Sequence, residues 1–463
     1  MIQWEKIISY LPEVTGPKGR RLSFKEKATW TLATLVFFYV MGRIPLFGLG
    51  ENALQQFEYL SIILGAEFGS LVSLGIGPLV TASIVLQLLT GSGIVKFDVT
   101  TSEGKRKFQA VQKMAAFFFI LFEAAIYVLM GGLAPAAAYK GSSIYLQLEM
   151  LLILQLFISG ILIMFMDEVV SKWGFGSGIS LFIAAGVGQS LFIRAFSWTA
   201  SPANPDVATG AVWAFFQSLA NESPIDALLL LSSLLATVAV FALAVYSQGM
   251  KVEIPLSFGR IRGHGIRWPL SFIYTSNIPV ILVSALIANI QLWARLLQNW
   301  GYPLLGTFSG NSPASGLVSW IYAPNIIQKI ITNSITPTDV FQALFYVAFM
   351  MAGAVVFSYF WVQTAGMDAR SQAKQMLSSG LQIPGFRKDE RILEHLLERY
   401  IGPLTIMGAL SVGFLAAFAD LTGALVHGTS LLLSVMIVYK LYEEIAKQHM
   451  LDMHPLMRRF MEQ

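Results

Sequence analysis

The sequence predicts an all-α polytopic membrane protein, and three observations carry this prediction. First, 55% of the 463 residues are hydrophobic and only 13% are charged, well below the roughly 25% typical of soluble domains. Second, the apolar residues gather into long runs, and the mean hydropathy of the chain is +0.63. Third, lysine and arginine are distributed unevenly among the connections between these runs.

Ten apolar runs are candidate transmembrane helices. A helix needs about 20 predominantly apolar residues to cross a bilayer, and all the runs except the second have roughly this length. They lie near residues 28–48, 78–91, 114–134, 144–166, 177–194, 226–249, 270–294, 339–363, 401–422 and 429–446.

The charge distribution orients these runs. If the chain starts on the cytoplasmic side, the connections on that side carry twenty-six of the 31 lysine and arginine residues. An excess of positive charge marks the cytoplasmic loops of membrane proteins. We therefore expect ten spans with both termini in the cytoplasm. The outer side keeps only Arg43, Lys140, Arg194, Arg295 and Lys329.

The second run is the least typical, and the rest of the chain is organised around it. A half-polar stretch leads into a break at Gly75-Ile76-Gly77-Pro78, after which an uncharged run continues to Gly91. Proline suits the first turn of a helix, so a new helix is expected to start near Pro78. Only about 13 residues follow, too few to span a bilayer. Such broken helices occur where they line a cavity or are buried in protein, which predicts a pore or binding site here.

Two of the expected cytoplasmic connections, 251–269 and 364–400, are long and basic. Glycine and proline in the first suggest a small hairpin-like excursion, and the second shows helical spacing from Asp389 onward. Cytoplasmic loops need lysine and arginine in any membrane protein, but paired basic groups on two loops also suit a partner covered in phosphate. The expected outer connections, 195–225 and 295–338, have the composition of ordered surface loops.

Catalytic chemistry finds little support in the sequence. The chain has no cysteine, and its five histidines form no HExxH motif. The stretch Gly174-Phe175-Gly176-Ser177-Gly178 has the glycine content of a phosphate loop, but no GK[ST] follows it, so close helix packing explains it better. No enzyme activity, cofactor or metal is expected.

The ionisable residues inside the runs are Glu123, Glu149 and Asp420. Charges at membrane depth are costly and usually functional, so these three keep open a second class of function. That alternative is a secondary transporter of a small solute, with a midplane site at the broken helix. Against it, no polar cluster in the runs has the composition of a solute site.

Six long motifs are distributed along the chain. They are LGIGPLVTASIVLQLLTGSGI (Leu74–Ile94), DEVVSKWGFGSGISLFIAAGV (Asp167–Val187), YTSNIPVILVSALIANIQLW (Tyr274–Trp293), FGRIRG (Phe258–Gly263), GFRKDERILEHLLERYI (Gly385–Ile401) and ALVHGTSLLLSVMIVYKLYEE (Ala424–Glu444). These motifs resemble the SecY family of protein-conducting channels, the channel subunits of the Sec translocase. The resemblance covers essentially the whole chain, and the form of the Gly385–Ile401 stretch is similar to the archaeal and eukaryotic branch.

The resemblance implies ten transmembrane helices in two pseudo-symmetric five-helix halves around a central hourglass pore. The halves are expected at 1–194 and 226–463, joined by an external connection at 195–225. The broken second helix then divides into a plug and a pore-lining half. The waist of the pore is expected to be an aliphatic ring of Ile76, Val80, Ile179, Ile183, Ile281 and Leu433.

The resemblance also assigns the plug, the lateral gate and a docking surface. The plug is expected at about 57–70, and the gate lies between helices two and three and helices seven and eight. The two basic loops become the ribosome docking surface. The plug residues are Phe57, Glu58, Leu60, Ile62, Ile63, Leu64, Glu67 and Phe68; the gate residues are Thr81, Gln87, Glu123 and Asn289; the docking residues are Arg260, Arg262, Arg387 and Lys388.

The implied activity is passage of unfolded polypeptides across the membrane and lateral insertion of hydrophobic segments into the bilayer. The implied partners are a SecE/γ-type single-span subunit, a small β-type subunit, the ribosome, signal sequences and nascent chains, and membrane lipid, with no DNA. The N-terminal residues have no apolar core before a small-residue cleavage site, so no signal peptide is expected. The expected location is the cell membrane, with an archaeal plasma membrane favoured over the endoplasmic reticulum.

Overall fold

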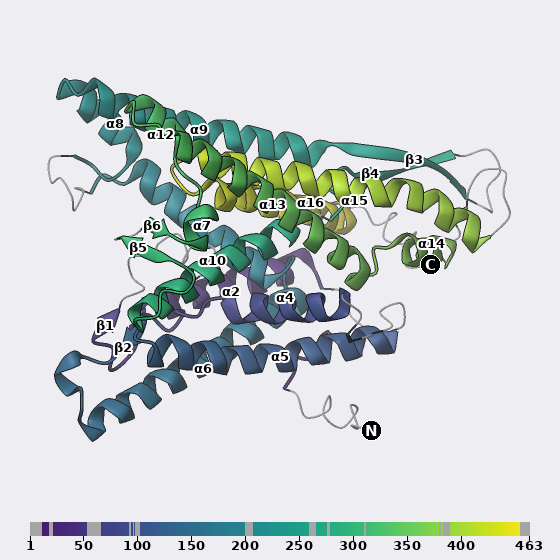
Figure 1. The fold of residues 1–463 in the computed structure, drawn as a ribbon. Helices are drawn as coiled ribbons and strands as arrows, with labels where there is room; N and C mark the ends of the chain where they lie inside the picture. The colour runs from purple at the N-terminus through teal and green to yellow at the C-terminus, as the bar shows by residue number, and fades with distance from the viewer. Residues whose placement is uncertain are drawn as a thin grey trace.

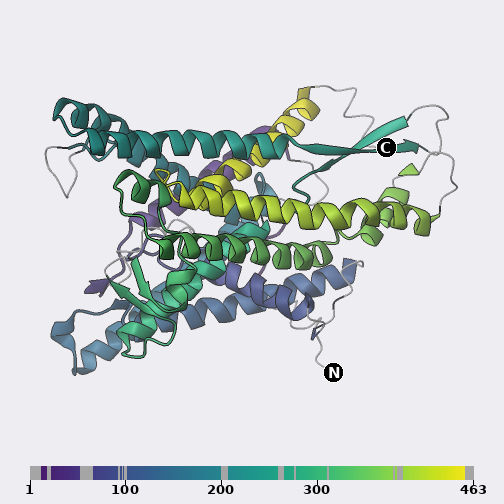
Figure 2. The same cartoon turned by 45° about the horizontal axis from the view of Figure 1, so that its top comes forward.

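The computed structural model is a bundle of long helices that lie side by side, with small sheets at both ends (Figures 1 and 2). The first-half helices α2, α4, α5 and α6 form one layer, and α9, α13, α15 and α16 form another (Figure 1). The structure describes residues 12–17, 22–52, 66–91, 94–95, 97, 102–199, 207–258, 265–275, 278–309, 312–378, 381–382 and 389–453.

Each of the ten apolar runs coincides with a described helix. In chain order these helices are α2 (Phe24–Arg43), α4 (Gly77–Gly91), α5 (Ser102–Leu129), α6 (Ser143–Trp173), α7 (Gly178–Phe196), α9 (Pro224–Gly249), α10 (Ile278–Asn299), α13 (Pro337–Thr364), α15 (Glu390–Leu421) and α16 (Gly428–Met453).

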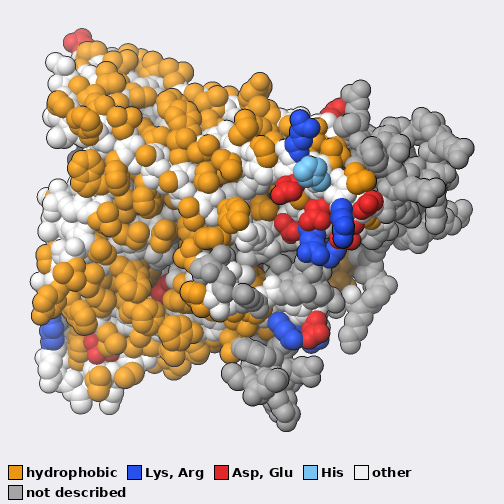
Figure 3. Space-filling model, turned by 45° about the vertical axis from the view of Figure 1, so that its right-hand side comes forward, with side chains coloured by type: hydrophobic (Ala, Val, Ile, Leu, Met, Phe, Trp, Pro, Cys, Tyr) orange, Lys and Arg blue, Asp and Glu red, His pale blue; other side chains and the backbone are white. Residues whose placement is uncertain are grey.

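Seven of the described helices are long and apolar enough to cross a membrane by length and composition. Of the other three, α4 has only 15 residues, as the break at Pro78 predicts. The remaining two, α2 and α16, carry several charged residues within a span's length. Apolar side chains cover most of the face seen in Figure 3, and most of its charged side chains gather at one end, with a few at the other.

The shorter elements lie between these helices and at their ends. They include four short helical segments and a single 3₁₀ turn. These are α8 (Ala211–Ala220), α11 (Leu317–Trp320), α12 (Ile326–Ile331), α14 (Ala369–Ser378) and the 3₁₀ turn Ala137–Tyr139.

Strands occur only in small sheets at the two ends of the described bundle. A three-stranded sheet at one end, which we call the sheet end, has the order β4-β3-β7. Two-stranded pairs, β1 with β2 and β5 with β6, lie at the opposite end, the far end (Figure 1). The strands are β1 (Glu51–Asn52), β2 (Leu133–Ala134), β3 (Lys251–Phe258), β4 (Gly265–Ser271), β5 (Thr307–Ser309), β6 (Ser312–Ser315) and β7 (Leu381–Gln382).

The sheet end joins the two long basic connections. Strands β3 and β4 form the hairpin predicted in 251–269, and β7, from the 364–400 connection, pairs antiparallel with β3 at Ser257 and Phe258. An apolar cluster that includes Ile254, Leu270 and Leu397 packs this sheet against α14 and α15. The two loops are therefore one platform. The docking residues Arg260, Arg262, Arg387 and Lys388 lie outside the described residues.

Two helices differ from the expected pattern. Helix α15 begins at Glu390, where the Asp389 side chain caps it, and continues through Pro403 for 32 residues; the ninth apolar run is thus only its second part. The connection 195–225, expected as a surface loop, contains α8, which packs against α9. Its apolar composition, AVWAFFQSLA, accounts for this helix.

Candidate pore and lateral gate

The break before α4 is a compact turn. Gly75 has φ +52°, a left-handed conformation that glycine adopts at little cost, and α4 starts at Gly77, so that Pro78 occupies the first turn as expected. The backbone N–H of Val80 donates to the carbonyl of Ile76 at 3.1 Å. The break therefore places Ile76 and Val80 one helical turn apart, on the same side of α4 and of the turn before it.

The segment just before the break is pinned to the end of α2. The N–H of Leu46 donates to the carbonyl of Gly69 at 2.9 Å, and the N–H of Leu71 donates to the carbonyl of Ile44 at 2.9 Å. Pro45 and Ser70 form an antiparallel bridge between these hydrogen bonds. The far-end approach to α4 is thus held by backbone contacts.

The predicted plug falls partly on this pinned segment. Glu67 is exposed and Phe68 is half-buried, and the N–H of Ser70 donates to the carbonyl of Glu67 at 3.0 Å. The remaining plug residues lie outside the described residues: Phe57, Glu58, Leu60, Ile62, Ile63 and Leu64.

The six residues predicted to form the ring all belong to the main hydrophobic core of the described residues, which contains 40 buried side chains. Five are buried members of this cluster, and the sixth, Ile179, is a half-buried side chain packed against it. Ile76 and Leu433, from opposite ends of the sequence, are each only 1% exposed. Ile76 lies in the turn before α4 and the other five lie on α4, α7, α10 and α16, so the cluster joins the first and second parts of the chain. Its residues are Ile76, Val80, Ile179, Ile183, Ile281 and Leu433.

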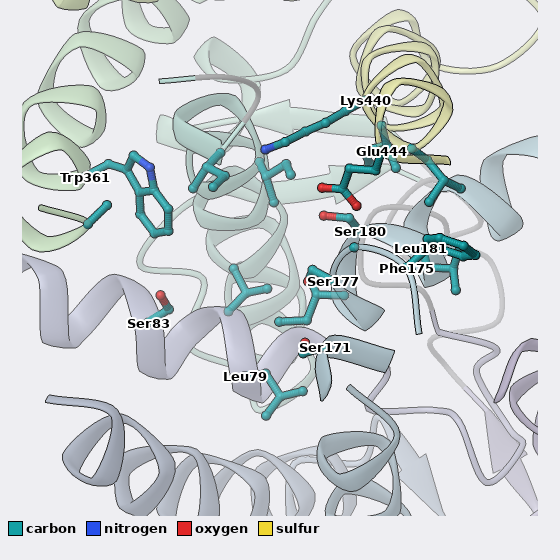
Figure 4. A pocket seen from close by; sticks show the side chains of 18 of the residues that line it. Leu79, Ser83, Ser171, Phe175, Ser177, Ser180, Leu181, Trp361, Lys440 and Glu444 are labelled. Carbon is teal, nitrogen blue, oxygen red and sulfur yellow. The ribbon is translucent and has the colours of Figure 1, made fainter. Parts of the chain in front are cut away.

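A cavity of about 940 Å³ lies against the sheet-end side of this ring. Three of the six predicted ring residues, Val80, Ile179 and Ile281, are part of its apolar lining. Helices α4, α5, α6, α7, α10, α13 and α16 contribute side chains to its wall, and Figure 4 shows these side chains converging from several helices.

The mouth of this cavity is polar, which the sequence did not indicate. Four lysines and one glutamate are among the lining residues, and Lys440 and Glu444 approach it from α16 (Figure 4). Positive-inside loops also carry lysine, so only the three-dimensional arrangement distinguishes the cavity residues from the others. The charged lining residues are Lys27, Lys105, Lys440, Glu444 and Lys447.

Three of the four predicted gate residues form a hydrogen-bonded group. Thr81 Oγ1 donates to Glu123 Oε1 at 2.9 Å, and Asn289 Nδ2 donates to Thr81 Oγ1 at 3.3 Å. These residues come from α4, α5 and α10, so the contact crosses from the first part of the chain to the second. Glu123 is only 2% exposed.

Hydrogen bonding is incomplete within this group of Thr81, Glu123 and Asn289, which we call the gate group. Glu123 Oε2 and Asn289 Oδ1 are buried and accept no hydrogen bond from any described residue. A buried polar atom without a partner costs about 1–3 kcal/mol. The closed contact between these helices is therefore weaker than its buried position suggests.

Gln87, the fourth predicted gate residue, lies apart from this group. Its Nε2 donates to Ser83 Oγ at 3.0 Å within α4, and both side chains line the sheet-end cavity. Six residues separate it from Thr81, which places the two side chains about 120° apart around the helix. Gln87 therefore lines the cavity and makes no hydrogen bond with the other three predicted gate residues.

We call the boundary between α4 and α5 on one side and α10 and α13 on the other the seam. Apolar packing closes it on the far-end side of the gate group. Tyr127 from α5 and Ala288 and Leu292 from α10 share one buried cluster with Leu74, which precedes α4. Helix α4 also contacts both α10 and α13. The seam thus has an open cavity at the sheet end, a polar middle and an apolar far end.

The other two intramembrane carboxylates are not part of this site. Asp420 Oδ2 accepts from the Tyr346 hydroxyl at 2.7 Å, and its Oδ1 accepts from the Thr429 N–H at 2.8 Å. This arrangement fixes the turn between α15 and α16. Glu149 is only half-buried. Among the described residues, no three histidine, aspartate or glutamate side chains are grouped to hold a metal ion.

An N-terminal strap crosses the sheet-end tips of α5 and α6, and the sequence did not indicate it. Lys172 pairs with Glu13 at 2.5 Å, and Glu168 accepts from the Val14 N–H at 2.9 Å and pairs with Lys113. The hydrogen bond from Lys172 holds the pKa of Glu13 below its ordinary value. The strap, residues 12–17, therefore ties α5 to α6 by alternating charges.

Comparison with known proteins identifies a family that covers most of the chain and relatives that cover nearly all of it. The family model described as SecY matches residues 70–442. The chain is 45% identical to the protein translocase subunit SecY of Methanothermobacter thermautotrophicus, with 99% of this chain and 98% of that protein covered. It is 41% identical to the same subunit of Pyrococcus furiosus, with 97% of each covered.

Solved structures agree with the sequence relatives. A protein-conducting channel superposes with a TM-score of 0.82 at 39% identity, covering 97% of this chain and 98% of that chain. A SecY structure concerned with the plug domain and the closed state gives 0.81 at 39% identity, with the same coverage. Sec61 in the canine ribosome-channel complex gives 0.79 at 37% identity, again with the same coverage. The chain belongs to the SecY family.

Proposed function

We propose that this chain is the protein-conducting channel of a Sec translocon, which passes unfolded polypeptides across the membrane and releases hydrophobic segments sideways into lipid. The observation that carries the proposal is a group of three aliphatic side chains, Val80, Ile179 and Ile281, which come from α4, α7 and α10 and line a polar-mouthed cavity. They belong to the same hydrophobic core as the other proposed ring residues, Ile76, Ile183 and Leu433. A hydrophobic constriction resists ions by excluding water. It also offers no hydrogen bonds, so chains of any sequence can pass.

The plug is proposed at about 57–70, on the far-end side of the ring. Support comes from the end of this stretch, because backbone hydrogen bonds and a β-bridge join residues 69–71 to the end of α2. These contacts would anchor the C-terminal end of the plug.

The lateral gate is proposed at the seam between α4 and α5 on one side and α10 and α13 on the other. Its polar middle is the Thr81–Glu123–Asn289 group. Polar contacts between membrane helices contribute only about 0.6–2 kcal/mol each, so this seam can be closed yet ready to part. A signal sequence that binds the open state better than the closed state shifts that equilibrium.

The docking surface for the ribosome is proposed on the platform at the sheet end. The pairing of β7 with β3 supports it by holding the two basic loops together. Arg260 and Arg262 follow β3 directly, and Arg387 and Lys388 follow β7 by a few residues. Contacts with phosphate would make docking weaken steeply as salt rises. The related canine channel is seen in a ribosome-channel complex.

Topology, location and partners complete the proposal. The sheet end faces the cytoplasm because the connections at that end carry most of the lysine and arginine, and both termini lie on that side. The 1–194 and 226–463 halves are clamped by a SecE/γ-type single-span subunit, and a small β-type subunit completes the complex. The membrane is an archaeal plasma membrane, in keeping with the archaeal relatives. The chain is no enzyme, and a partner supplies the driving force.

The transporter alternative is not favoured. A solute site coupled to ions needs its ionisable groups together, whereas Glu123 lies in the gate group and Asp420 is fully engaged at the α15–α16 turn. The unpaired oxygens of the gate lie between helices that must separate in a channel.

Ion conductance of the purified channel complex tests the proposal. Replacing Ile281 with Asn hydrates the ring, so leak of small ions across a planar bilayer rises severalfold. Ile281→Leu keeps the apolar volume and seals like the parent. A stalled translocating chain carrying a photo-crosslinker in its middle is expected to label Ile76 and Ile281. Equal leak in both variants, with no label at the ring, would refute the ring assignment.

A further inference from the structure

An aromatic contact bridges the gate seam outside the polar group. Phe122 of α5 and Trp293 of α10 place their ring centroids 5.9 Å apart, with the ring planes tilted by 42°. Each side chain is 36% exposed, which is the exposure expected of groups at the lipid-facing surface of a membrane bundle. Of the gate group behind them, Glu123 is buried, and Thr81 and Asn289 are half-buried.

Sequence spacing places this contact beside the polar group, on the outer surface and about one helical turn nearer the far end. Phe122 precedes Glu123, so the two side chains point about 100° apart around α5. Trp293 follows Asn289 by four residues and therefore lies on the same face of α10, one turn nearer the far end. The same two helices thus make a polar contact through Thr81 inside the bundle and an aromatic contact on its outer surface.

Other aromatic rings support Phe122 from its own helix. Phe118 stacks on Phe122 with centroids 5.7 Å apart and planes 13° apart, and Phe119 meets it edge-on at 6.3 Å. Phe118 is 61% exposed. Aromatic pairs prefer offset-stacked or edge-to-face arrangements within this range of distances. The α5 side of the bridge is therefore a preassembled aromatic surface, and Trp293 is its partner across the seam.

We propose that Phe122 and Trp293 form a lipid-side latch on the lateral gate, which sets how hydrophobic a segment must be before it leaves sideways. The proposal rests on the lateral-gate function proposed above. The rings must part before a segment can reach lipid, and their contact is then lost. An apolar segment replaces that contact with its own side chains, whereas a polar segment leaves the rings without an equivalent partner.

Insertion assays with a graded series of segments test the latch in the assembled complex. The series increases the leucine content of one reporter segment, and the readout is the leucine content at which half the chains insert. Phe122→Ala and Trp293→Ala are each expected to move this midpoint to less hydrophobic segments. The double variant should move it little further, because either substitution breaks the same contact. Trp293→Phe should keep a midpoint near that of the parent.

A matched control comes from a second exposed aromatic pair. Phe414 and Phe418 stack within α15 with centroids 6.1 Å apart, so Phe414→Ala and Phe418→Ala remove lipid-facing rings without touching the seam. These variants should insert like the parent. A midpoint shift in the controls as large as that in Phe122→Ala would overturn the latch, because loss of any exposed ring would then suffice.

Cross-linking provides the converse test. The chain has no cysteine, so Phe122→Cys with Trp293→Cys introduces one reactive pair. A short bis-thiol reagent across that pair should stop lateral insertion while a secretory chain without an apolar segment still crosses. Unchanged insertion after bridging would overturn both the latch and the proposed position of the gate. Insertion stopped by bridging, with parent-like midpoints in Phe122→Ala and Trp293→Ala, would overturn the latch alone. Failure of the parent to translocate the secretory chain would instead overturn the proposed function.

Discussion

Two buried carboxyl groups in this molecule have opposite surroundings. Asp420, at the turn between α15 and α16, has a hydrogen bond to each oxygen, from Thr429 and from Tyr346. Glu123, at the seam between the two parts of the chain, has one oxygen bonded to Thr81 and the other without a described partner. A fully satisfied carboxylate holds a structure together, and a half-satisfied one marks a place where helices can separate.

Removing the satisfied carboxylate should have the larger effect on stability. Asp420→Ala removes the buried acceptor of the Tyr346 hydroxyl and of the Thr429 N–H, so we expect a loss of roughly 2–4 kcal/mol in stability. The measurement is the thermal unfolding of the complex in detergent, with Tyr346→Phe as a milder control that removes one bond. The comparison breaks if Asp420→Ala opens the gate as readily as a substitution at Glu123 does.

Removing the half-satisfied carboxylate should act on gating instead. Glu123→Ala loses the hydrogen bond from Thr81, which shifts the gate toward the open state by roughly 0.6–2 kcal/mol, or about 3- to 30-fold in the equilibrium. Cross-linking of a signal sequence to the seam measures the shift. Glu123→Gln keeps an acceptor for Thr81 and should stay near the parent. Cross-linking in Glu123→Ala equal to that in the parent would refute a role of the gate group in opening the seam.

Gln87 sharpens the distinction between the seam and the cavity wall. Its hydrogen bond to Ser83 stays within α4, so Gln87→Ala should change the gate equilibrium by less than about 1 kcal/mol. The same signal-sequence cross-linking assay applies, with Glu123→Ala measured beside it. An effect equal to that of Glu123→Ala would return Gln87 to the gate.

The smallest expected effect lies at the N-terminal strap. The hydrogen bond and charge of Lys172 lower the pKa of Glu13 from 4.5. The ion pair therefore stabilises the strap fully above that pH and is lost as the pH falls through the lowered pKa. Limited proteolysis near residues 12–17 should quicken on acidification in the parent, whereas Glu13→Gln should be cleaved quickly at every pH. If the proteolysis rate of the parent does not change with pH, backbone hydrogen bonds and not the ion pair hold the strap.

Much of this architecture could be predicted from the sequence because membrane thickness imposes a simple rule. Apolar runs of about 20 residues mark the helices, and Pro78 marks the start of the short one. The prediction of the aliphatic ring depended on the family resemblance, because an isoleucine in a helix is usually an ordinary core residue. The structure then brings its six residues into a single cluster.

Other features lack a local signal. The two-residue strand β7 owes its existence to pairing with β3 across more than a hundred residues of sequence, and no short motif encodes such a contact. The continuation of α15 through Pro403 runs against the usual rule for proline and reflects packing by neighbouring helices. The strap depends on charges from three separate segments. The separation of Gln87 from Thr81 was available from helical spacing.

Helix α15 has a mechanical consequence. Its 32 residues make a rod about 48 Å long, well beyond the ~30 Å hydrocarbon layer. One end is packed into the platform through Leu393 and Leu397, and the other ends at the Asp420 turn. A tilt of about 5° at the platform would displace the opposite end by about 4 Å if the rod were rigid. Pro403 cannot donate a backbone hydrogen bond, so the rod is more flexible at this residue, and bending there takes up part of that tilt.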